Sequence, residues 1–571
     1  MASQSVMVME QDRLMWDRIE LSYSDDSNGE QREVVLPFRI LAMANFSGKE
    51  AGDDTTPLVT HTVTAESVES LLKALQITFS FTFPVGQKSI DASLVIEQFS
   101  DFLPQSLITR VKPLRQLSEV ISLLERQEQS DFSTQPEWLQ QHLLQCGVNS
   151  SEPLPRLVSI SLLRTTLQQL LNRVLHQPRF IELETLWRDL LVIVTALKGK
   201  SALLDILDIH YDRLRDDCGT GQEVFSSQLY HLLYNIEYGQ FGGVPYSVAV
   251  LGFSFGPKRH QIRLLQQLAA IGSRCFLPFI AQASPAFFQV NSFRDLSTSR
   301  GLRELHQGPS FIHWRGFQQQ ENSRYIALTL PGVLRRLPYH SQTQSGTAFD
   351  EEIKSDARQM IWGSAAFDYV VCLLESYEKY GSAIDAVGPV GGRCPRPQQL
   401  NSNDHYRYPF VDLRISEARE SELADLGFMP LVLNGGGDAA HFHSANSIHW
   451  GGLGGLSGDQ EAVLDRRLNA QLPYLLLVTR VAHYLKVIER DRLGGLTTPA
   501  EVVSQLNHWL QQYVSDVDNP VAAVRARRPF RAAAVTLMGS DDSQQHTLQL
   551  QLVPHLKIVG ARFSLSLQGT I

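Results

Sequence analysis

Short segments in which apolar and polar residues alternate stand at both ends of this 571-residue chain. Residues 18–23 alternate in this way near the start, and residues 548–552 and 563–567 do so near the end. A period of two is typical of a β-strand with one buried face and one solvated face. The chain must therefore fold with β-strands at both termini.

The predicted N-terminal strand consists of Arg18, Ile19, Glu20, Leu21, Ser22 and Tyr23. A polar segment without periodicity, residues 24–31, follows it and is typical of a flexible link. A lone strand before such a link is marginal by itself and needs a sheet edge to join. That edge belongs either to the strand's own domain or to another molecule, and the pattern leaves both alternatives open.

The apolar positions of the last two predicted strands are Leu548, Leu550, Leu552, Phe563, Leu565 and Leu567. A further alternating stretch, Val535–Leu537, comes before them. With β-type arms at both ends, the chain carries donors and acceptors for strand pairing between copies.

The middle of the chain mixes helical and strand patterns. Apolar residues at helical spacing predict helices over 113–124, 138–144, 163–174, 264–271, 478–488 and 503–513. Apolar runs predict strands over 34–42, 76–83, 91–96 and 247–251. A single core rarely grows beyond ~250–300 residues. The predicted fold class is therefore α+β (mixed α/β) with several domains.

Residues 149–155 contain two prolines and two serines, which disfavour both helix and sheet. This segment predicts a junction between two parts of the chain. The expected division is an N-terminal arm and link over 1–33, a first domain over 34–146, a linker over 147–160, a second domain over 161–530 and a C-terminal β region over 531–571.

The composition excludes several classes of protein. Hydrophobic residues make up 43% of the chain and charged residues 19%, as in an ordinary globular protein. No apolar run reaches the ~18 residues of a membrane span, and Met1–Asp12 shows no secretory signal. Five scattered cysteines without a CxxC pair indicate reduced thiols in the cytoplasm. A net charge of -9 argues against a nucleic-acid partner.

Gly252–Gly256 fits the GxSxG pattern of a serine hydrolase, with Ser254 as the nucleophile. Pro257 follows directly, and the spacing indicates no partner Asp and His, so a turn between strand and helix is the favoured interpretation. Lys198–Ser201 carries the end of a phosphate-binding loop, but Val194 stands where the first glycine is required. A polar turn between helix and strand is the interpretation there.

His441 and His443, after Asp438 and before His449, are the best candidates for metal ligands. The many glycines around them would have to be ordered at an entropic cost, so the sequence favours no metal site. Arg525, Arg527, Arg528 and Arg531 form a basic cluster. This cluster is either a solvated face or a contact to acidic residues of a neighbouring copy or partner.

Several motifs together carry a resemblance to a known family. They are Val34–Phe38, Met43–Gly48, Phe99–Pro104, His176–Phe180, Leu183–Arg188, Glu237–Gly243, Ala283–Pro285, Ser323–Tyr325, Leu328–Pro331, Trp362–Gly363 and Leu472–Lys486. In this order, the chain resembles both halves of the type VI secretion contractile sheath: a TssB-like small subunit followed by a TssC-like large subunit (the VipA/VipB family).

The resemblance implies a structural protein, not an enzyme, that needs no cofactor and works in the bacterial cytoplasm. Its copies would polymerise as a helical cylinder around an Hcp-type inner tube, stand on baseplate proteins and contract to propel the tube. By resemblance, the arginine cluster would contact a neighbouring copy or the tube. The alternatives are a non-contracting cap or baseplate adaptor of the same machine, or a serine or metal hydrolase.

One departure from the family concerns the recycling of contracted sheath. In the two-gene family, the large subunit opens with a long segment whose helix is recognised by the AAA+ unfoldase ClpV. Here the TssB-like part ends near Cys146 and the TssC-like part is under way by Leu163. Because the space between them is too short for that segment, recognition by a ClpV-type unfoldase is doubtful.

Overall fold

The computed structural model describes most of the chain between residues 21 and 568. The described residues are 21, 23–25, 32–50, 56–85, 88–126, 135–146, 148, 155–219, 221–297, 301–340, 349–353, 360–383, 385–394, 409–434, 439–449, 470–492, 499–517, 528, 530–538, 547–554 and 563–568.

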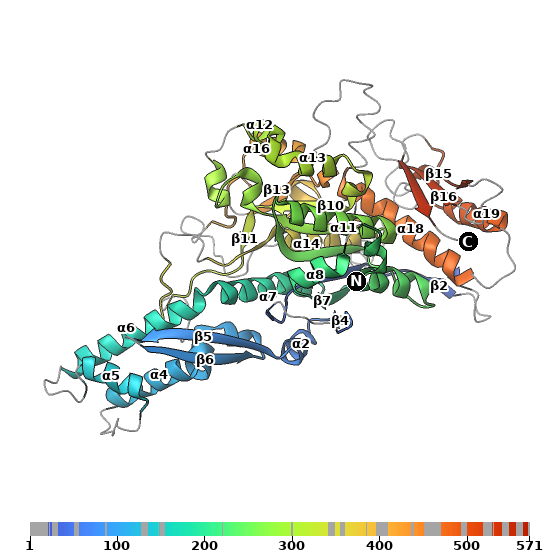
Figure 1. The fold of residues 1–571 in the computed structure, drawn as a ribbon. Helices are drawn as coiled ribbons and strands as arrows, with labels where there is room; N and C mark the ends of the chain where they lie inside the picture. Colours follow the sequence, from blue (N-terminus) through green and yellow to red (C-terminus); the bar gives the residue numbers. More distant parts are fainter. Residues whose placement is uncertain are drawn as a thin grey trace, which may run out of the picture.

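An eight-stranded sheet organises the body of the molecule, in the order β14-β13-β10-β9-β8-β3-β7-β4 (Figure 1). Its strands are β3 (Arg39–Ala44), β4 (Thr60–Val63), β7 (Leu203–Asp208), β8 (Val248–Phe255), β9 (Phe279–Ala283), β10 (Ile326–Leu330), β13 (Met429–Leu433) and β14 (Ala440–Phe442). The strands from β7 to β13 run parallel, and the edge strands β4 and β14 pair antiparallel. Parallel strands are buried on both faces, which is why these segments are nearly continuous apolar runs.

The first part of the chain contributes β3 to the middle of this sheet, between β7 and β8, and β4 to its edge. The structure thus places β3 and β4, from the predicted first domain over residues 34–146, in a sheet whose other strands come later in the chain. Leu41, Ala42 and Met43 are fully buried, so β3 needs a strand on each side and cover on both faces. The predicted strand over 34–42 is also divided, because residues 35–38 separate β2 (Arg32–Val34) from β3.

Helices cover both faces of the sheet. They are α7 (Pro178–Ala196), α8 (Tyr211–Cys218), α11 (Arg259–Cys275), α13 (Ile312–Gln318), α14 (Ala365–Tyr380) and α18 (Leu472–Arg492). Ile40 and Ala42 of β3 share one hydrophobic core with α7, α14 and α18. Leu41 and Met43 lie in a second core with α8, α11 and α13. Since successive strand residues point to opposite faces, the body is a three-layer α/β/α arrangement.

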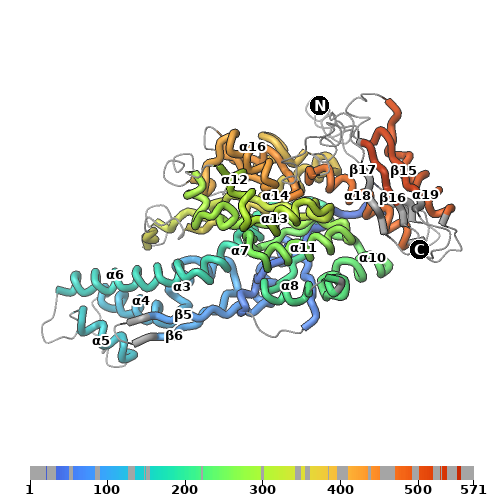
Figure 2. Tube along the Cα trace, turned by 45° about the horizontal axis from the view of Figure 1, so that its top comes forward, coloured from blue at the N-terminus to red at the C-terminus, as the bar shows by residue number. Residues whose placement is uncertain are grey.

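An elongated lobe projects from the body (Figures 1 and 2). Its elements are β5 (Ile77–Val85), β6 (Lys88–Ile96), α3 (Pro104–Arg110), α4 (Lys112–Glu125), α5 (Glu137–Gln145) and α6 (Arg156–Leu175). They confirm the strands and helices that the sequence predicts in this region. Helix α4 buries Leu114, Leu117 and Val120 and packs against α6. Helix α6 leads directly into α7, so the two helices join the lobe to the body.

The remaining helices and the other strands complete the fold. They are α2 (Val68–Ala74), α9 (Gln228–Tyr230), α10 (Glu237–Gly239), α12 (Leu302–Gln307), α15 (Gly388–Gly391), α16 (Glu417–Asp425), α19 (Pro499–Gln511), β1 (Tyr23–Asp25), β11 (Gly332–Leu334), β12 (Trp362–Ser364), β15 (Phe530–Met538), β16 (Thr547–Pro554) and β17 (Phe563–Gln568). The helices predicted over 264–271, 478–488 and 503–513 correspond to α11, α18 and α19 and are confirmed. Among the described helices, none combines the length and apolar character needed to cross a bilayer.

A buried histidine in the second core predicts acid sensitivity. His306 is 4% exposed, stacks on Phe311, and donates from Nε2 to the Phe287 carbonyl. Burial lowers the pKa of its ring to about 4. Below pH 6.5 the His306 ring of the unfolded chain binds a proton, whereas the buried ring of the folded chain stays neutral until the pH approaches 4. The free energy of unfolding therefore falls as the pH falls towards 4.

We expect His306→Phe to remove about 2 kcal/mol of the loss in unfolding free energy between pH 7 and pH 5. The measurement compares urea unfolding of parent and variant at both pH values. Groups common to both chains, including Asp189, cancel in this difference. An identical pH dependence in the two chains would contradict the prediction.

Candidate functional site

The N-terminal segment is fastened to the body at its base. Leu21 is 4% exposed, and its carbonyl accepts a hydrogen bond from the Tyr484 hydroxyl of α18. The same hydroxyl accepts from the Leu36 amide at 2.9 Å. Arg480, one turn earlier on α18, donates to the carbonyls of Leu36 and Pro37. Residues on both sides of the β1–β2 hairpin are therefore held by one helix.

The predicted arm strand is only partly within the described residues. Arg18, Ile19, Glu20 and Ser22 lie outside them. Leu21 is buried at the arm base, and Tyr23 opens β1, where it pairs antiparallel with Val34 of β2. Ser24 and Asp25 belong to β1, so the predicted link begins after them. Strand pairing between copies stays a prediction, because the structure holds one chain.

We expect Tyr484→Phe to loosen the arm base. The substitution removes the donor to the Leu21 carbonyl and the acceptor for the Leu36 amide, which are both buried. Leaving two such groups unsatisfied costs roughly 1–3 kcal/mol each. Hydrogen exchange of the Leu36 amide should become at least about tenfold faster. Unchanged exchange at Leu36 would contradict this assignment.

The C-terminal strands form a three-stranded antiparallel sheet in the order β15-β16-β17. The predicted apolar positions face one another across β16 and β17: Leu548 pairs with Leu567, Leu550 with Leu565, and Leu552 with Phe563. Leu550 and Leu552 are fully buried. The predicted strands are thus confirmed, and Leu550 and Leu552 confirm the alternation in β16.

The two edges of this sheet differ. At the β15 edge, the Asn507 side chain of α19 donates to the Val535 carbonyl and accepts from the Val535 amide, both at 2.8 Å. Gln511 donates to the Ala533 carbonyl at 3.1 Å. These side chains occupy groups that a further strand would need. At the other edge, β17 has β16 as its one neighbour among the described strands.

Two of the four residues of the predicted arginine cluster are described, and both lie at this sheet. Arg525 and Arg527 lie outside the described residues. Arg528 is exposed just before β15, and Arg531 is exposed on β15 itself. Its contact to a neighbouring copy or to a tube stays a prediction.

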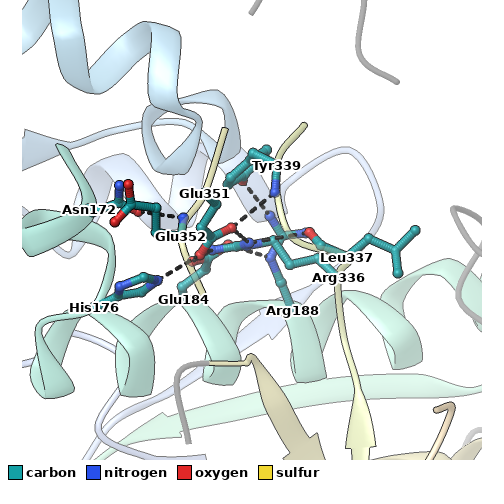
Figure 3. Close-up of polar contacts among 9 residues, drawn as sticks. All are labelled: Asn172, His176, Glu184, Arg188, Arg336, Leu337, Tyr339, Glu351 and Glu352. Carbon is teal, nitrogen blue, oxygen red and sulfur yellow. Dashed lines mark hydrogen bonds and ion pairs between the residues drawn. The ribbon is translucent and has the colours of Figure 1, made fainter. Parts of the chain in front are cut away.

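A buried charge network joins the lobe to the body (Figure 3). Arg336, in the chain after β11, donates to Glu184 of α7 at 2.7 Å and to Glu351 at 2.6 Å. Glu351 lies 3.1 Å from Nε2 of His176, at the end of α6. The Glu352 amide donates to Asn172 of α6 at 3.1 Å. The network thus holds both sides of the bend between α6 and α7.

Electrostatics keep this network charged in spite of its burial. Burial opposes the Glu184 carboxylate, but the charges of Arg336 and Arg188 outweigh it and lower its pKa. Burial also opposes the Glu351 carboxylate, but Arg336, His176 and the Tyr339 amide lower its pKa to about 2. Removing Arg336 would take away the main opposite charge of both buried carboxylates.

The neighbouring Arg335 forms a second buried cluster. It pairs with Asp189 of α7 and donates to both carboxylate oxygens of Asp368 at 3.0 and 2.7 Å. Burial raises the pKa of Asp189 to about 6, although Arg335 and the Ser364 amide oppose the rise. A Cβ at Gly363 would overlap both Arg335 and Asp189. The Trp362–Gly363 motif therefore requires a glycine, because the Arg335–Asp189 ion pair lies where a side chain at position 363 would be.

The Glu237–Gly243 motif is also explained by buried charge. Arg39 of β3 pairs with Glu237 at 2.8 Å and with Asp205 of β7 at 2.7 Å. The second oxygen of Glu237 accepts from the Val244 amide at 2.8 Å and so closes the loop. A Cβ at Gly243 would lie 2.5 Å from the Glu237 carbonyl oxygen. The motif is thus a rigid loop that the first part of the chain fixes through Arg39.

The hydrolase candidate does not have the geometry of a nucleophile elbow. Strand β8 continues to Phe255, so Ser254 lies within the strand and not at the turn that the sequence predicts. That correction follows from the pairing of Ser254 with Gln282 of β9. Lys198 and Gly199 form a turn between α7 and β7, as predicted.

The histidine candidates are close but incomplete as a metal site. The ring centroids of His441 and His443 are 6.2 Å apart. Nδ1 of His449 is within hydrogen-bond distance of the Ser323 hydroxyl, at 2.9 Å. Within the part of the chain that the structure describes, no group of three potential ligands is arranged to hold a metal.

Sequence reasoning missed the buried charge clusters. A signal was present, because Glu184 and Asp189 interrupt an apolar helical stretch, and Arg335–Arg336 interrupt an apolar segment after Val333–Leu334. Charged residues are almost never fully buried unless they are paired. Complementary charges in two apolar segments were therefore a reason to expect contact.

Comparison with known proteins agrees with this architecture. Residues 11–140 match the type VI secretion system VipA family model, residues 158–449 match the VipB tail sheath N-terminal domain, and residues 461–571 match the VipB tail sheath gpW/gp25-like domain. The type VI secretion system sheath protein TssC1 of Pseudomonas aeruginosa is 31% identical over 446 residues, covering 75% of this chain and 89% of that protein.

Two solved structures are also similar. The contracted helical sheath of the anti-feeding prophage has a TM-score of 0.32 at 11% identity, over 64% of this chain and 78% of the other. A sheath tail protein from Listeria innocua has a TM-score of 0.29 at 10% identity, over 59% of this chain and 60% of the other.

The family-model matches and the similarity to TssC1 define a structural protein of the tail sheath class. The chain belongs to the sheath protein family of type VI secretion systems, with a VipA-like and a VipB-like part fused in one polypeptide. Its function is that of a sheath protomer, which assembles with its own copies into a helical sheath.

Proposed function

We propose that this chain builds, from one polypeptide, a contractile sheath around an Hcp-type inner tube and contracts to propel that tube. Baseplate proteins would hold the extended sheath, and the setting would be the bacterial cytoplasm. The observation that carries the proposal is the joining of VipA-like and VipB-like parts through one sheet, with β3 between β7 and β8. Fusion fixes the ratio of the two parts at one to one.

The strand arms supply a mechanism for holding the polymer together while it changes shape. The β17 edge supports strand addition by a neighbour, since side chains of α19 occupy the opposite edge. The predicted strand over 18–23 is the one we propose to be shared between copies. Heterologous contacts of this kind do not close and generate an open helix. Modest differences between two packings, summed along a filament, supply work on contraction.

We further propose that the chain has no catalytic activity and keeps the expected division of the chain. That division is an arm over 1–33, a VipA-like part over 34–146, a linker over 147–160, a VipB-like part over 161–530 and a β region over 531–571. The position of Ser254 within β8 supports the structural role over a serine hydrolase.

Negative-stain electron microscopy of the purified chain tests the proposal. A contractile sheath predicts long tubules with cogwheel cross-sections that shorten when contraction is triggered. A cap or baseplate adaptor predicts discrete particles without tubules. A hydrolase predicts an activity that Ser254→Ala abolishes, or bound zinc in elemental analysis. Discrete particles or such an activity would reject the proposal.

A ClpV-type unfoldase is expected to bind contracted sheath of this chain weakly or not at all. The VipA match ends at residue 140 and the VipB match begins at residue 158, which leaves little chain for a recognition segment. A pull-down with the unfoldase, followed by ATP-dependent disassembly assays, measures this. Strong binding with rapid disassembly would contradict the prediction.

A further inference from the structure

A small cavity lies beneath the arm base, where the N-terminal segment, the end of α14 and α18 meet. Its lining includes Leu21, Phe38, Tyr377, Ala383, Arg480 and His483, and its volume is ≈ 20 Å³. One water molecule needs roughly 10–15 Å³ of such space. The cavity is therefore large enough for a single water.

His483 contributes an acceptor to this cavity. The side chain is 1% exposed, and Nε2 lies 3.2 Å from the Phe276 carbonyl oxygen. A carbonyl oxygen only accepts, so Nε2 carries the hydrogen. Burial, followed by the nearby charge of Arg480, lowers the pKa of the ring to about 3, and the ring is neutral at physiological pH. Nδ1 therefore carries a lone pair, and it has no hydrogen-bond partner among the described residues.

Arg480 contributes a donor to the same cavity. Its side chain is buried, and its two terminal nitrogens donate to the Leu36 and Pro37 carbonyls and to the Tyr377 hydroxyl. The N–H on Nε has no acceptor in the described part of the chain. Buried polar groups are nearly always hydrogen-bonded to protein or to ordered water. The two residues that carry this unsatisfied donor and this unsatisfied acceptor both line the cavity.

We propose that this cavity is a binding site for one water molecule, which accepts from Arg480 Nε and donates to His483 Nδ1. Of water, a halide and a metal cation, only water both accepts a hydrogen bond from Arg480 Nε and donates one to His483 Nδ1. A halide would face the lone pair of Nδ1, and a metal cation would face the guanidinium. The bound water supplies the acceptor for Nε of the guanidinium that holds Leu36 and Pro37, and so helps to fasten the arm.

A structure of the sheath or of the unassembled chain at about 2 Å resolution or better tests the site directly. We expect one density peak within hydrogen-bonding distance of both atoms. Absence of the peak, with both side chains in place, would overturn the proposal. A crystal soaked in bromide gives the second arm, because an anomalous peak in the cavity would show an anion site instead.

The role in holding the arm is tested with His483→Phe, which removes the acceptor and fills the space. We expect trypsin cleavage after Arg32 in β2 to become about fivefold faster in the unassembled chain, as the loss of one hydrogen-bonded contact implies. Thr479→Val is the matched control, because Thr479 lines the same cavity but its hydroxyl donates to the Leu476 carbonyl. Equal cleavage rates in the parent and His483→Phe would overturn this role.

Discussion

Replacing Arg336 by alanine is expected to lower the free energy of unfolding of the unassembled chain by about 3–5 kcal/mol. Arg336 is 3% exposed and pairs with two buried carboxylates, Glu184 and Glu351. Without the guanidinium, both carboxylates lose their main opposite charge, and only Arg188 beside Glu184 and His176 beside Glu351 remain. Urea unfolding followed by far-UV circular dichroism measures the change.

Arg179→Ala is the matched control for this substitution. Arg179 also forms an ion pair, with Glu50 at 2.5 Å, but the two side chains are 52% and 78% exposed. Exposed pairs contribute only about 0–1 kcal/mol. If Arg336→Ala destabilises the chain no more than Arg179→Ala does, the network does not fasten the bend between α6 and α7.

Deleting residues 1–23 is expected to abolish sheath tubules while the remaining chain stays folded. The deletion removes the predicted arm strand over 18–23. It also removes Leu21, whose burial contributes about 2 kcal/mol, which is a minor share of the body's cores. Electron microscopy shows whether tubules form, and circular dichroism shows whether the shortened chain is folded.

Deleting residues 1–17 is the control, since it keeps the strand over 18–23 and the contact of Leu21 with Tyr484. We expect tubules from this variant. Normal tubules from the chain that lacks residues 1–23 would refute the role of the arm, and with it the proposed strand exchange between copies.

Much of the local structure could be predicted from the sequence. Alternation over 548–552 and 563–567 corresponds to β16 and β17, and the apolar spacing over 163–174 corresponds to α6. An alternating or helical apolar pattern predicts such segments because it depends on neighbouring residues alone. The motif order also indicated the family correctly, since those residues stand in turns and ion pairs that the fold requires.

Three features could not be predicted in this way. Strand β3 lies between strands that come much later in the chain, and Leu21 meets Tyr484, 463 positions away. Arg336 meets Glu184, 152 positions away. Local periodicity shows which face of an element is buried, but it does not show against which partner.

The sequence by itself determined the strands at the two termini, the amphipathic helices and the family, because each depends on neighbouring residues or on motif order. Only the tertiary structure decided that the two parts share one sheet and that buried charges hold the lobe to the body. It also decided that one hydroxyl of α18 fastens the arm. The physical reason is that a buried charge or strand is stable only beside a partner, and the packing of distant segments supplies that partner.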